Sequence, residues 1–539
     1  MAASNPNISI HNLSFHISDT AVRFDSINLS FSQRKIGVIG DNGIGKTSLF
    51  KLITGELAPT SGTIHCNASI CYCPQIIKTN YANIATALGV KPILDALQRI
   101  KSGSTNEDDY AMLNEQWDIE EKVKKTLDYF YFKTDSLCDD FNTLSGGEKT
   151  KLQLARAYLS QADFILLDEP TNNLDQATRL RLQQFINSSK KHFIVISHDR
   201  DLLNQMNEIV ELSTLGINHY GGNYNYYFSE KQKSIQAAVQ LLNARKEETK
   251  KAKQLAQIRR ERHEQAAAKG RKAKIAEIRA KGSYDKLGFK SAQGRSEATN
   301  KRIKEQAKRK INGTEEQLSL AKTRLEFKTS IDVSLDATQV PKGKTVLNIE
   351  NLTFYYDTKK PLFRNFNLHL QGPERVALTG KNGCGKTTLI KLIRQQLPPI
   401  AGRINLGVKH ICYLDQQISF LDKEKSLLDN FIEKNPKATL EDAHLALAQF
   451  NFRNQSALKQ VKHLSGGERI RAGLAISMMS DTAPQLIILD EPSNHLDIRS
   501  IEQIEMSLAN YQGALIVISH DQSFLSRLSV NRYIQLEKG

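Results

Sequence analysis

Residues 39–64 read IGDNGIGKTSLFKLITGELAPTSGTI, and residues 379–404 read TGKNGCGKTTLIKLIRQQLPPIAGRI. Each contains the pattern Gly-x4-Gly-Lys-Thr between a strand-like apolar run and a helical pattern. Glycines there let backbone N–H groups turn toward phosphate oxygens, the lysine reaches the outer phosphates, and the threonine hydroxyl is placed for Mg²⁺. Both loops are therefore expected to bind a nucleoside triphosphate with Mg²⁺, through Gly40, Asp41, Asn42, Gly43, Ile44, Gly45, Lys46, Thr47 and Ser48, and through Gly380, Lys381, Asn382, Gly383, Cys384, Gly385, Lys386, Thr387 and Thr388.

The repetition extends well beyond the two loops. Three further stretches recur in the same order: 144–159 with 464–479, 164–175 with 486–497, and 193–203 with 515–525. Within each copy, short apolar runs alternate with longer helix-compatible stretches, a pattern typical of buried parallel strands with crossover helices. We therefore expect an α/β fold with two tandem P-loop domains, at 1–232 and 336–539, joined by a linker at 233–335.

Acidic residues end one strand-like run in each copy. Asp168 and Asp490 are placed to hold Mg²⁺, together with Thr47 and Thr387. Glu169 and Glu491 follow directly, so strand alternation turns them elsewhere, where each can act as the base or the orienting group for an attacking water. The plainer alternative is a pair of strand-end acids that cap the next helix; the neighbouring phosphate loops favour the catalytic interpretation.

The LSGGE stretches at 144–148 and 464–468 resemble the signature of the ATP-binding cassette superfamily. The resemblance covers both halves nearly end to end, and it implies that two cassettes close head to tail over two ATP molecules. Each signature opens a helix, so its N–H groups can meet a γ-phosphate bound on the other cassette. One composite site would join Lys46, Thr47, Asp168, Glu169 and His198 with Ser465, Gly466 and Gly467. The second would join Lys386, Thr387, Asp490, Glu491 and His520 with Ser145, Gly146 and Gly147.

The same resemblance assigns several accessory roles. It implies that Gln75 and Gln416 contact Mg²⁺ and water, and that Asp175 and Asp497 lie where the cassettes meet. It also implies that Tyr356 stacks on adenine, whereas the first copy has Ile17 at that position. Asn173 replaces a histidine that matches His495 in the second copy. Both sites keep Lys, Thr, Asp, Glu and His, so both are expected to hydrolyse ATP, at rates that can differ.

The linker carries nearly all of the excess charge. The chain has a net charge of +16, and residues 241–310 alone hold 23 Lys and Arg against 8 Asp and Glu, a net +15. Stretches 233–280 and 296–326 have a helix-friendly composition and a thin apolar stripe, which favours two antiparallel helices rather than a core. The tip is expected near 281–297, around GSYDKLGFKSAQGR at 282–295.

Two cassettes on one chain with a basic linker and no membrane domain resemble the ABC-F class of translation and antibiotic-resistance factors. The resemblance implies an ATPase bound near the ribosomal exit site, with the linker reaching ribosomal RNA and transfer RNA. It implies a role in ribosome protection against antibiotics or in the rescue of stalled ribosomes. In the tip, Tyr284 and Phe289 could stack on bases, or they could merely close the hairpin.

Other readings and placements remain open at this stage. The chain could be the ATPase subunit of a membrane exporter, or a DNA-binding ATPase of the same superfamily. No signal peptide or membrane-spanning run is evident, and the six cysteines form no CxxC pair, which favours a cytoplasmic protein. A monomer with intramolecular cassette closure is expected. The stretch from Gln75 to Leu144 is 21 residues longer than its counterpart from Gln416 to Leu464, which predicts a small insertion in the first cassette.

Overall fold

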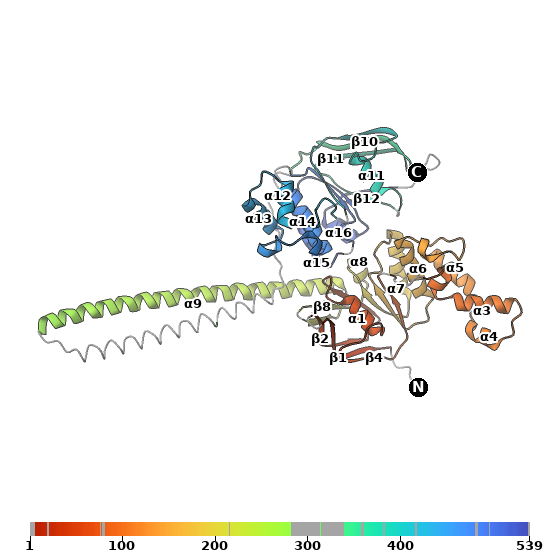
Figure 1. Ribbon diagram of the computed structural model, residues 1–539, viewed down its shortest axis with the longest axis horizontal. Coiled ribbons are helices and arrows are strands. Elements are labelled where there is room, and N and C mark those ends of the chain that lie inside the picture. Colours follow the sequence, from red (N-terminus) through yellow and green to blue (C-terminus); the bar gives the residue numbers. More distant parts are fainter. Residues whose placement is uncertain are drawn as a thin grey trace. The chain divides into compact units, whose positions relative to one another are not determined.

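The computed structural model (Figure 1) describes most of both cassettes and the first half of the linker. The described residues are 6–18, 21–75, 77, 81–214, 216–281, 313, 339–356, 361–380, 383–415, 418–479, 483–494 and 496–536. Lys381, Asn382 and Gln416 lie outside them, as do His495 and the predicted linker tip at 282–295. The chain divides into two compact units, one of residues Met1–Tyr226 with Ser330–Gly539 and one of residues Tyr227–Thr329.

The first cassette is built on a six-stranded sheet in the order β5-β6-β7-β3-β8-β9. Its first five strands are parallel, and β9 pairs antiparallel with β8. A separate antiparallel sheet has the order β2-β1-β4. The strands are β1 (Ile8–Ser18), β2 (Ala21–Phe31), β3 (Lys35–Gly40), β4 (Ser61–Cys66), β5 (Ile70–Cys73), β6 (Phe164–Asp168), β7 (His192–Ile196), β8 (Glu208–Ser213) and β9 (Gly216–Tyr220).

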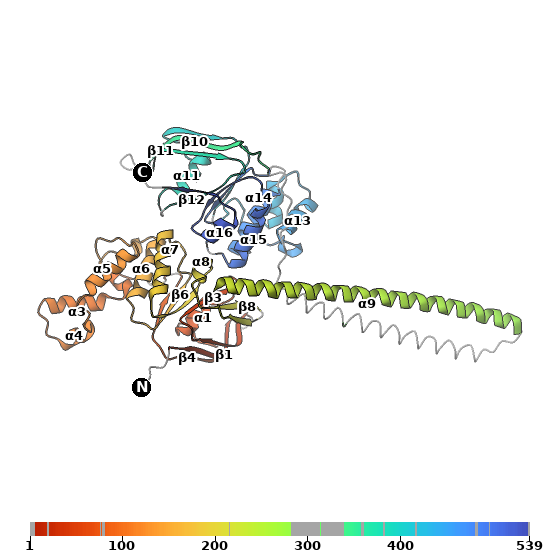
Figure 2. The ribbon, with the colours of Figure 1, turned by 180° about the vertical axis from the view of Figure 1, so that it is seen from behind.

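The central strands of this sheet are buried over most of their length. All five residues of β6, FILLD, are buried, as expected for a parallel strand covered on both faces. The helices are α1 (Lys46–Ile53), α2 (Ile84–Leu88), α3 (Lys91–Lys101), α4 (Glu107–Leu113), α5 (Ile119–Tyr129), α6 (Gly146–Leu159), α7 (Gln176–Ser188) and α8 (Arg200–Leu203). The predicted insertion falls among α2 to α5, and α3 and α4 project from the rest of the cassette in both views (Figure 1, Figure 2).

The second cassette repeats this plan. Its five-stranded sheet, in the order β14-β15-β16-β12-β17, is parallel throughout, and an antiparallel sheet has the order β11-β10-β13. The strands are β10 (Thr345–Phe354), β11 (Phe363–Gln371), β12 (Arg375–Thr379), β13 (Ala401–Leu406), β14 (Ile411–Leu414), β15 (Leu486–Asp490), β16 (Ala514–Ile518) and β17 (Arg532–Gln535). The helices are α11 (Lys386–Ile393), α12 (Leu427–Lys434), α13 (Leu440–Gln449), α14 (Gly466–Met478), α15 (Ile498–Ala509) and α16 (Gln522–Arg527). The predicted α/β architecture with two cassettes is confirmed.

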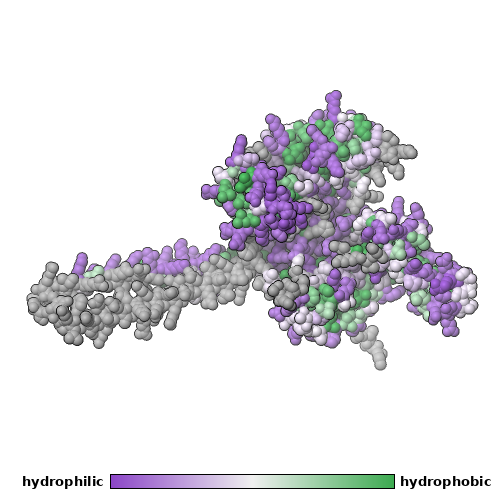
Figure 3. Space-filling model, in the orientation of Figure 1, coloured by the Kyte–Doolittle hydropathy of each residue, from purple (hydrophilic) through white to green (hydrophobic). Residues whose placement is uncertain are grey.

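The linker begins with one long helix, α9 (Tyr224–Lys281), of 58 residues. The helical prediction for 233–280 is therefore confirmed, although the helix starts earlier, within the range assigned to the first cassette. Its sequence holds 16 Lys and Arg against 6 Asp and Glu. The described side chains along α9 are mostly hydrophilic (Figure 3). Among the described residues, no helix combines the length and apolar character needed to cross a membrane.

Candidate nucleotide sites

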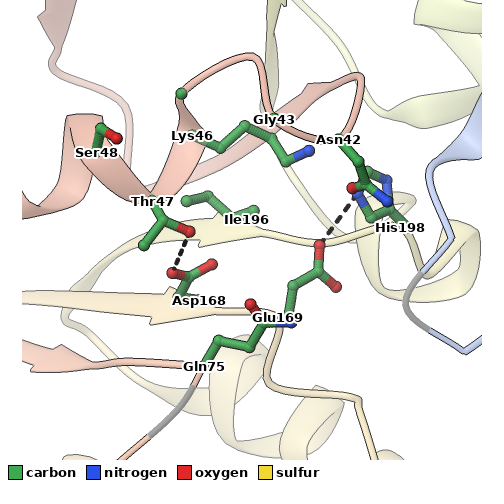
Figure 4. A pocket seen from close by; sticks show the side chains of 11 residues that line it. Asn42, Gly43, Lys46, Thr47, Ser48, Gln75, Asp168, Glu169, Ile196 and His198 are labelled. Atoms are coloured by element: carbon green, nitrogen blue, oxygen red, sulfur yellow. Dashed lines mark hydrogen bonds and ion pairs between the residues drawn. The ribbon is translucent and has the colours of Figure 1, made fainter. Parts of the chain in front are cut away.

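The first phosphate loop encloses one side of a cavity. Gly45 adopts φ 114°, a left-handed conformation that suits glycine, directly before α1 begins at Lys46. The Lys46 ammonium donates to the carbonyls of Gly40 at 2.6 Å and Asp41 at 3.2 Å. The adjoining cavity has a volume of about 310 Å³ and is lined by Asn42, Gly43, Gly45, Lys46, Thr47, Ser48, Gln75, Asp168, Glu169, Ile196 and His198 (Figure 4). Residues predicted from four separate stretches of sequence thus line one cavity.

A hydroxyl and a carboxylate lie together at the floor of this cavity. The Thr47 hydroxyl donates to Asp168 Oδ2 at 2.8 Å (Figure 4). The Tyr72 hydroxyl donates to the same oxygen at 3.4 Å. The other oxygen, Asp168 Oδ1, is buried without a hydrogen-bond partner among the described residues. Burial raises the pKa of Asp168. An unsatisfied carboxylate oxygen beside a hydroxyl fits Mg²⁺, which prefers oxygen ligands and would offset the cost of burial.

Glu169 faces a histidine across the cavity. Its Oε1 lies 3.3 Å from Nε2 of His198 (Figure 4). Its backbone has φ 51°, unusual for a residue other than glycine, and its N–H donates to the carbonyl of Ile196 at the end of β7. Burial raises the pKa of Glu169 to about 8 and lowers the pKa of His198 to about 3. His198 is therefore neutral at physiological pH, and Glu169 has the raised basicity that suits a general base.

The second cassette repeats several of these contacts. Lys386 donates to the carbonyl of Gly380 at 2.7 Å, and its ammonium lies 3.3 Å from Nε2 of His520. Oε1 of Glu491 lies 3.6 Å from the same histidine nitrogen. Burial raises the pKa of Glu491 to about 7 and lowers the pKa of His520 to about 4. Tyr413 donates to Asp490 at 3.0 Å, as Tyr72 does to Asp168.

Some residues of the loops contribute only their backbone. The Cys384 side chain is 4% exposed and packs in the apolar core of the second cassette, and Ile44 packs against the core of the first. Tyr356, by contrast, is 69% exposed, and its hydroxyl lies 3.3 Å from that of Thr388 in the first turn of α11. An exposed ring beside the phosphate loop is what adenine stacking requires. The Ile17 side chain, at the matching position, lies outside the described residues.

The two signatures begin helices as predicted. Ser145 and Ser465 are the N-caps of α6 and α14, and each forms a capping box with the glutamate three residues later. Gly146 and Gly466 are the first helical residues, followed by Gly147 and Gly467. The residues that line the first cavity include neither signature. Closure of the signatures over nucleotide therefore stays a prediction.

Contacts between the cassettes do reach the first phosphate loop. Asp497 Oδ2 accepts a hydrogen bond from the backbone N–H of Asn42 at 3.1 Å, and Arg499 donates to Asp41 at 3.0 Å. Asp497 is thus found where the resemblance implied, at the meeting of the two cassettes. The same carboxylate caps α15 through the N–H of Ser500. One carboxylate thus joins the start of α15 to the phosphate loop of the other cassette.

Sequence reasoning missed two groups of residues. Tyr72 and Tyr413, which donate to the strand-end aspartates, recur at one position in CYCPQ and CYLDQ, and that repetition was a usable signal. The other group is a buried ion pair between cassettes, in which Arg200 donates to Glu505 at 2.6 Å and 3.3 Å, with Arg527 3.2 Å from the same carboxylate. Arg200 has no counterpart in the repeat, where Gln522 stands, so no internal comparison pointed to it.

Known proteins support the assignment of both halves. The family described as ABC transporter matches residues 24–172 and 363–494. Ribosome protection protein VmlR of Bacillus subtilis (strain 168) is 30% identical over 99% of this chain and 87% of its own length. ABC transporter F family member 5 of Arabidopsis thaliana is 27% identical over 94% of this chain and 71% of its own.

A solved structure matches at the level of the fold. The structure titled RNase-L Inhibitor superposes with a TM-score of 0.58 at 16% identity, over 97% of this chain and 87% of its own. Both tandem cassettes are therefore matched in a protein of distant sequence. Together with the two nucleotide sites, these likenesses establish that the chain belongs to the ATP-binding cassette superfamily, as an ATPase of the ABC-F type.

Proposed function

We propose that this ATPase binds the ribosome near the exit site and uses ATP binding and hydrolysis to act on translation. Its action is ribosome protection against antibiotics or the rescue of stalled ribosomes, in the cytoplasm. The observation that carries the proposal is the linker: α9 is a mostly exposed helix of 58 residues with 16 basic and 6 acidic side chains. At about 1.5 Å per residue it spans about 87 Å, far more than a connection between two domains needs. A relative that matches nearly the whole chain is named a ribosome protection protein.

The chemistry follows from the contacts in each cassette. Lys46 and Lys386 bring positive charge to the outer phosphates, while Glu169 and Glu491 orient and deprotonate the attacking water. His198 and His520, neutral because they are buried, lie beside Glu169 and Glu491 as polar groups rather than as cations. Thr47 with Asp168, and Thr387 with Asp490, would hold Mg²⁺, which supplies positive charge against the phosphates.

Cassette closure completes both sites in this proposal. The signature of each cassette, Ser145 to Gly147 or Ser465 to Gly467, would bring helix N-terminal N–H groups to the γ-phosphate on the other cassette. Gln75 and Gln416 would contact Mg²⁺ and water, and Tyr356 would stack on adenine. The protein acts as a monomer of three parts: a cassette at 1–232, a basic linker at 233–335 that contacts ribosomal RNA and transfer RNA, and a cassette at 336–539.

The test is ribosome sedimentation with a hydrolysis-blocked protein. The double variant Glu169→Gln, Glu491→Gln should keep ATP and accumulate on ribosomes, because closure survives while water activation is lost. Overproduction of this variant should inhibit translation. Flotation with membranes would favour the exporter alternative. Retention on DNA beads after ribonuclease treatment, rather than on ribosomes, would favour a DNA-binding ATPase.

The linker predicts the salt dependence of the same assay. Contacts between lysine or arginine and phosphate release counterions, so affinity should fall steeply with salt. Replacing Lys250, Lys251 and Lys253 of α9 with Gln should flatten that dependence, while ATP hydrolysis by the free protein barely changes. An unchanged slope would show that this part of α9 does not face RNA.

A further inference from the structure

The second cassette has a basic pocket away from its phosphate loop. The pocket has a volume of about 380 Å³ and lies along β14, the edge strand of the five-stranded sheet. Four basic side chains from three segments line it: Arg394 directly after α11, Lys409 and His410 directly before β14, and Lys434 at the end of α12. All four are exposed at the surface. Segments far apart in the sequence thus bring positive charge to one concave site.

An aromatic side chain orients the arginine. The Arg394 guanidinium stacks over the ring of Tyr413, 4.4 Å from its centroid. The N–H groups of a guanidinium lie in its own plane, so stacking on a ring leaves them available. They can then donate two hydrogen bonds to one phosphate group. Phe420 supplies a further apolar wall. The pocket therefore combines an arginine guanidinium held in place by stacking with the ammonium groups of Lys409 and Lys434.

The basic side chains of this pocket are not paired with acidic side chains in the described part of the chain. No Asp or Glu is among its lining residues, and within the described part of the chain Arg394, Lys409 and Lys434 form no ion pair. Nearby surface lysines behave differently: Lys425 lies 2.7 Å from Glu433, and Lys462 pairs with Glu424. Cations at the ends of α11 and α12 also suit the helix dipole, but that does not account for Lys409 and His410 in the same pocket.

The first cassette shows that the fold does not require this charge. The matched positions hold Thr54, Ala68 and Ser69 in place of Arg394, Lys409 and His410. There the Ser69 hydroxyl donates to Asp163 at 2.8 Å, so an acidic group occupies the corresponding edge. The first cassette therefore carries neutral side chains beside Asp163 at these positions, so the basic side chains at 394, 409 and 410 are particular to the second copy.

We propose that this pocket binds backbone phosphates of RNA, with the ribosome of the proposed function as the source of that RNA. The two phosphate loops surround a triphosphate with backbone N–H groups at a helix start, whereas here helices end and only long side chains reach the ligand. The cations of this pocket are exposed and come from separate segments. This arrangement suits the single charges spaced along a nucleic acid strand better than the clustered charge of one triphosphate. The pocket adds a second RNA contact, on a cassette rather than on the linker.

The test measures ribosome binding of the full chain across a series of salt concentrations. Lys409→Gln with Lys434→Gln should lower the magnitude of the salt slope by about 1.4 to 1.8, because each lost phosphate contact removes about 0.7 to 0.9. The control is Lys342→Gln with Lys344→Gln, an equal charge change at exposed lysines outside the pocket. Arg394→Lys keeps the charge and should weaken binding a few-fold with little change of slope.

Each other outcome has a definite meaning. Equal slopes for the pocket variant and the parent, or an equal loss in the control variant, would overturn the pocket while leaving ribosome binding intact. If the parent does not sediment with ribosomes, the proposed function fails; the same series on a synthetic single-stranded RNA then decides the pocket alone. A labelled nucleotide should not bind Lys46→Ala, Lys386→Ala protein. Residual binding that disappears with Lys409→Gln and Lys434→Gln would make the pocket a nucleotide site instead.

Discussion

In the first cassette the lysine of the phosphate loop donates to Gly40, and in the second Lys386 donates to Gly380. Each cassette also places a tyrosine on its strand-end aspartate, and a glutamate with positive φ opposite a buried histidine. Around these shared contacts the copies diverge. The first has α3 and α4, and the second has an exposed Tyr356 and the basic pocket along β14.

The divergence separates two kinds of requirement. Chemistry at the phosphates depends on a few atoms at fixed distances, so both copies retain them. Surfaces that meet a partner need to match only that partner, so each copy can carry its own. We therefore expect substitutions at shared contacts to alter ATP hydrolysis, and substitutions at unshared features to alter binding or the balance between the sites.

The largest effect is expected from removing both water-activating carboxylates. Glu169→Gln with Glu491→Gln should lower ATP hydrolysis by about 100-fold or more, because a positioned general base contributes about 10²- to 10⁴-fold. Retained binding of labelled ATP would separate this loss from unfolding. The two single variants test whether the sites hydrolyse ATP equally. If the sites are equal and independent, each variant should keep about half of the parent's hydrolysis rate. Strongly unequal rates in the two variants would show that one site dominates.

The buried ion pair between the cassettes should matter next. Arg200→Ala leaves Glu505, only 7% exposed, with Arg527 as its remaining partner. Removing one member of a buried ion pair lowers the free energy of unfolding by about 3 to 5 kcal/mol. Because Arg527 remains beside Glu505, we expect a loss near the lower value. Thermal unfolding should register the loss as a lower midpoint. Arg527→Ala, which removes the more exposed partner, should lower the midpoint much less; equal shifts would contradict the buried role of Arg200.

Adenine stacking offers a sharper test of asymmetry. Tyr356→Ala should weaken ATP binding at the second site by about tenfold, because base–aromatic stacking contributes about 1 to 3 kcal/mol. The reciprocal change Ile17→Tyr should strengthen binding at the first site. Both affinities are measured with the opposite site disabled by Lys46→Ala or Lys386→Ala. Unchanged affinity in Tyr356→Ala would exclude the stacking role.

The smallest effect is expected from the tyrosines on the strand-end aspartates. Tyr413→Phe and Tyr72→Phe each delete one hydrogen bond and should slow hydrolysis by about two- to fivefold, since such a bond contributes about 1 kcal/mol. The Tyr413 change should be the larger, because its bond is 3.0 Å against 3.4 Å for Tyr72. Steady-state rates over a range of Mg²⁺ concentrations measure both. The reverse order would show that the distances do not govern the contribution.

Local spacing in the sequence determined much of this protein. The two phosphate loops, the strand-end acids, the helix-opening signatures and the helix through 233–280 each depend on neighbours within a few turns or strands. Repetition of the chain made these predictions stronger, because a pattern that occurs twice in the same order is rarely accidental. The fold class and the nucleotide chemistry followed from those patterns.

Contacts between distant segments, and pKa values that depend on exclusion of water, became visible only in the tertiary structure. Asp497 meets Asn42 across 455 residues of sequence, and Arg200 meets Glu505 across 305. The pKa of Glu169 rises to about 8 because strands and the phosphate loop bury it, a property that no spacing encodes. The basic pocket likewise exists only because α11, α12 and β14 end or begin at one place. Charge and burial are properties of the assembled surface, so they appear only when the segments that form it are brought together.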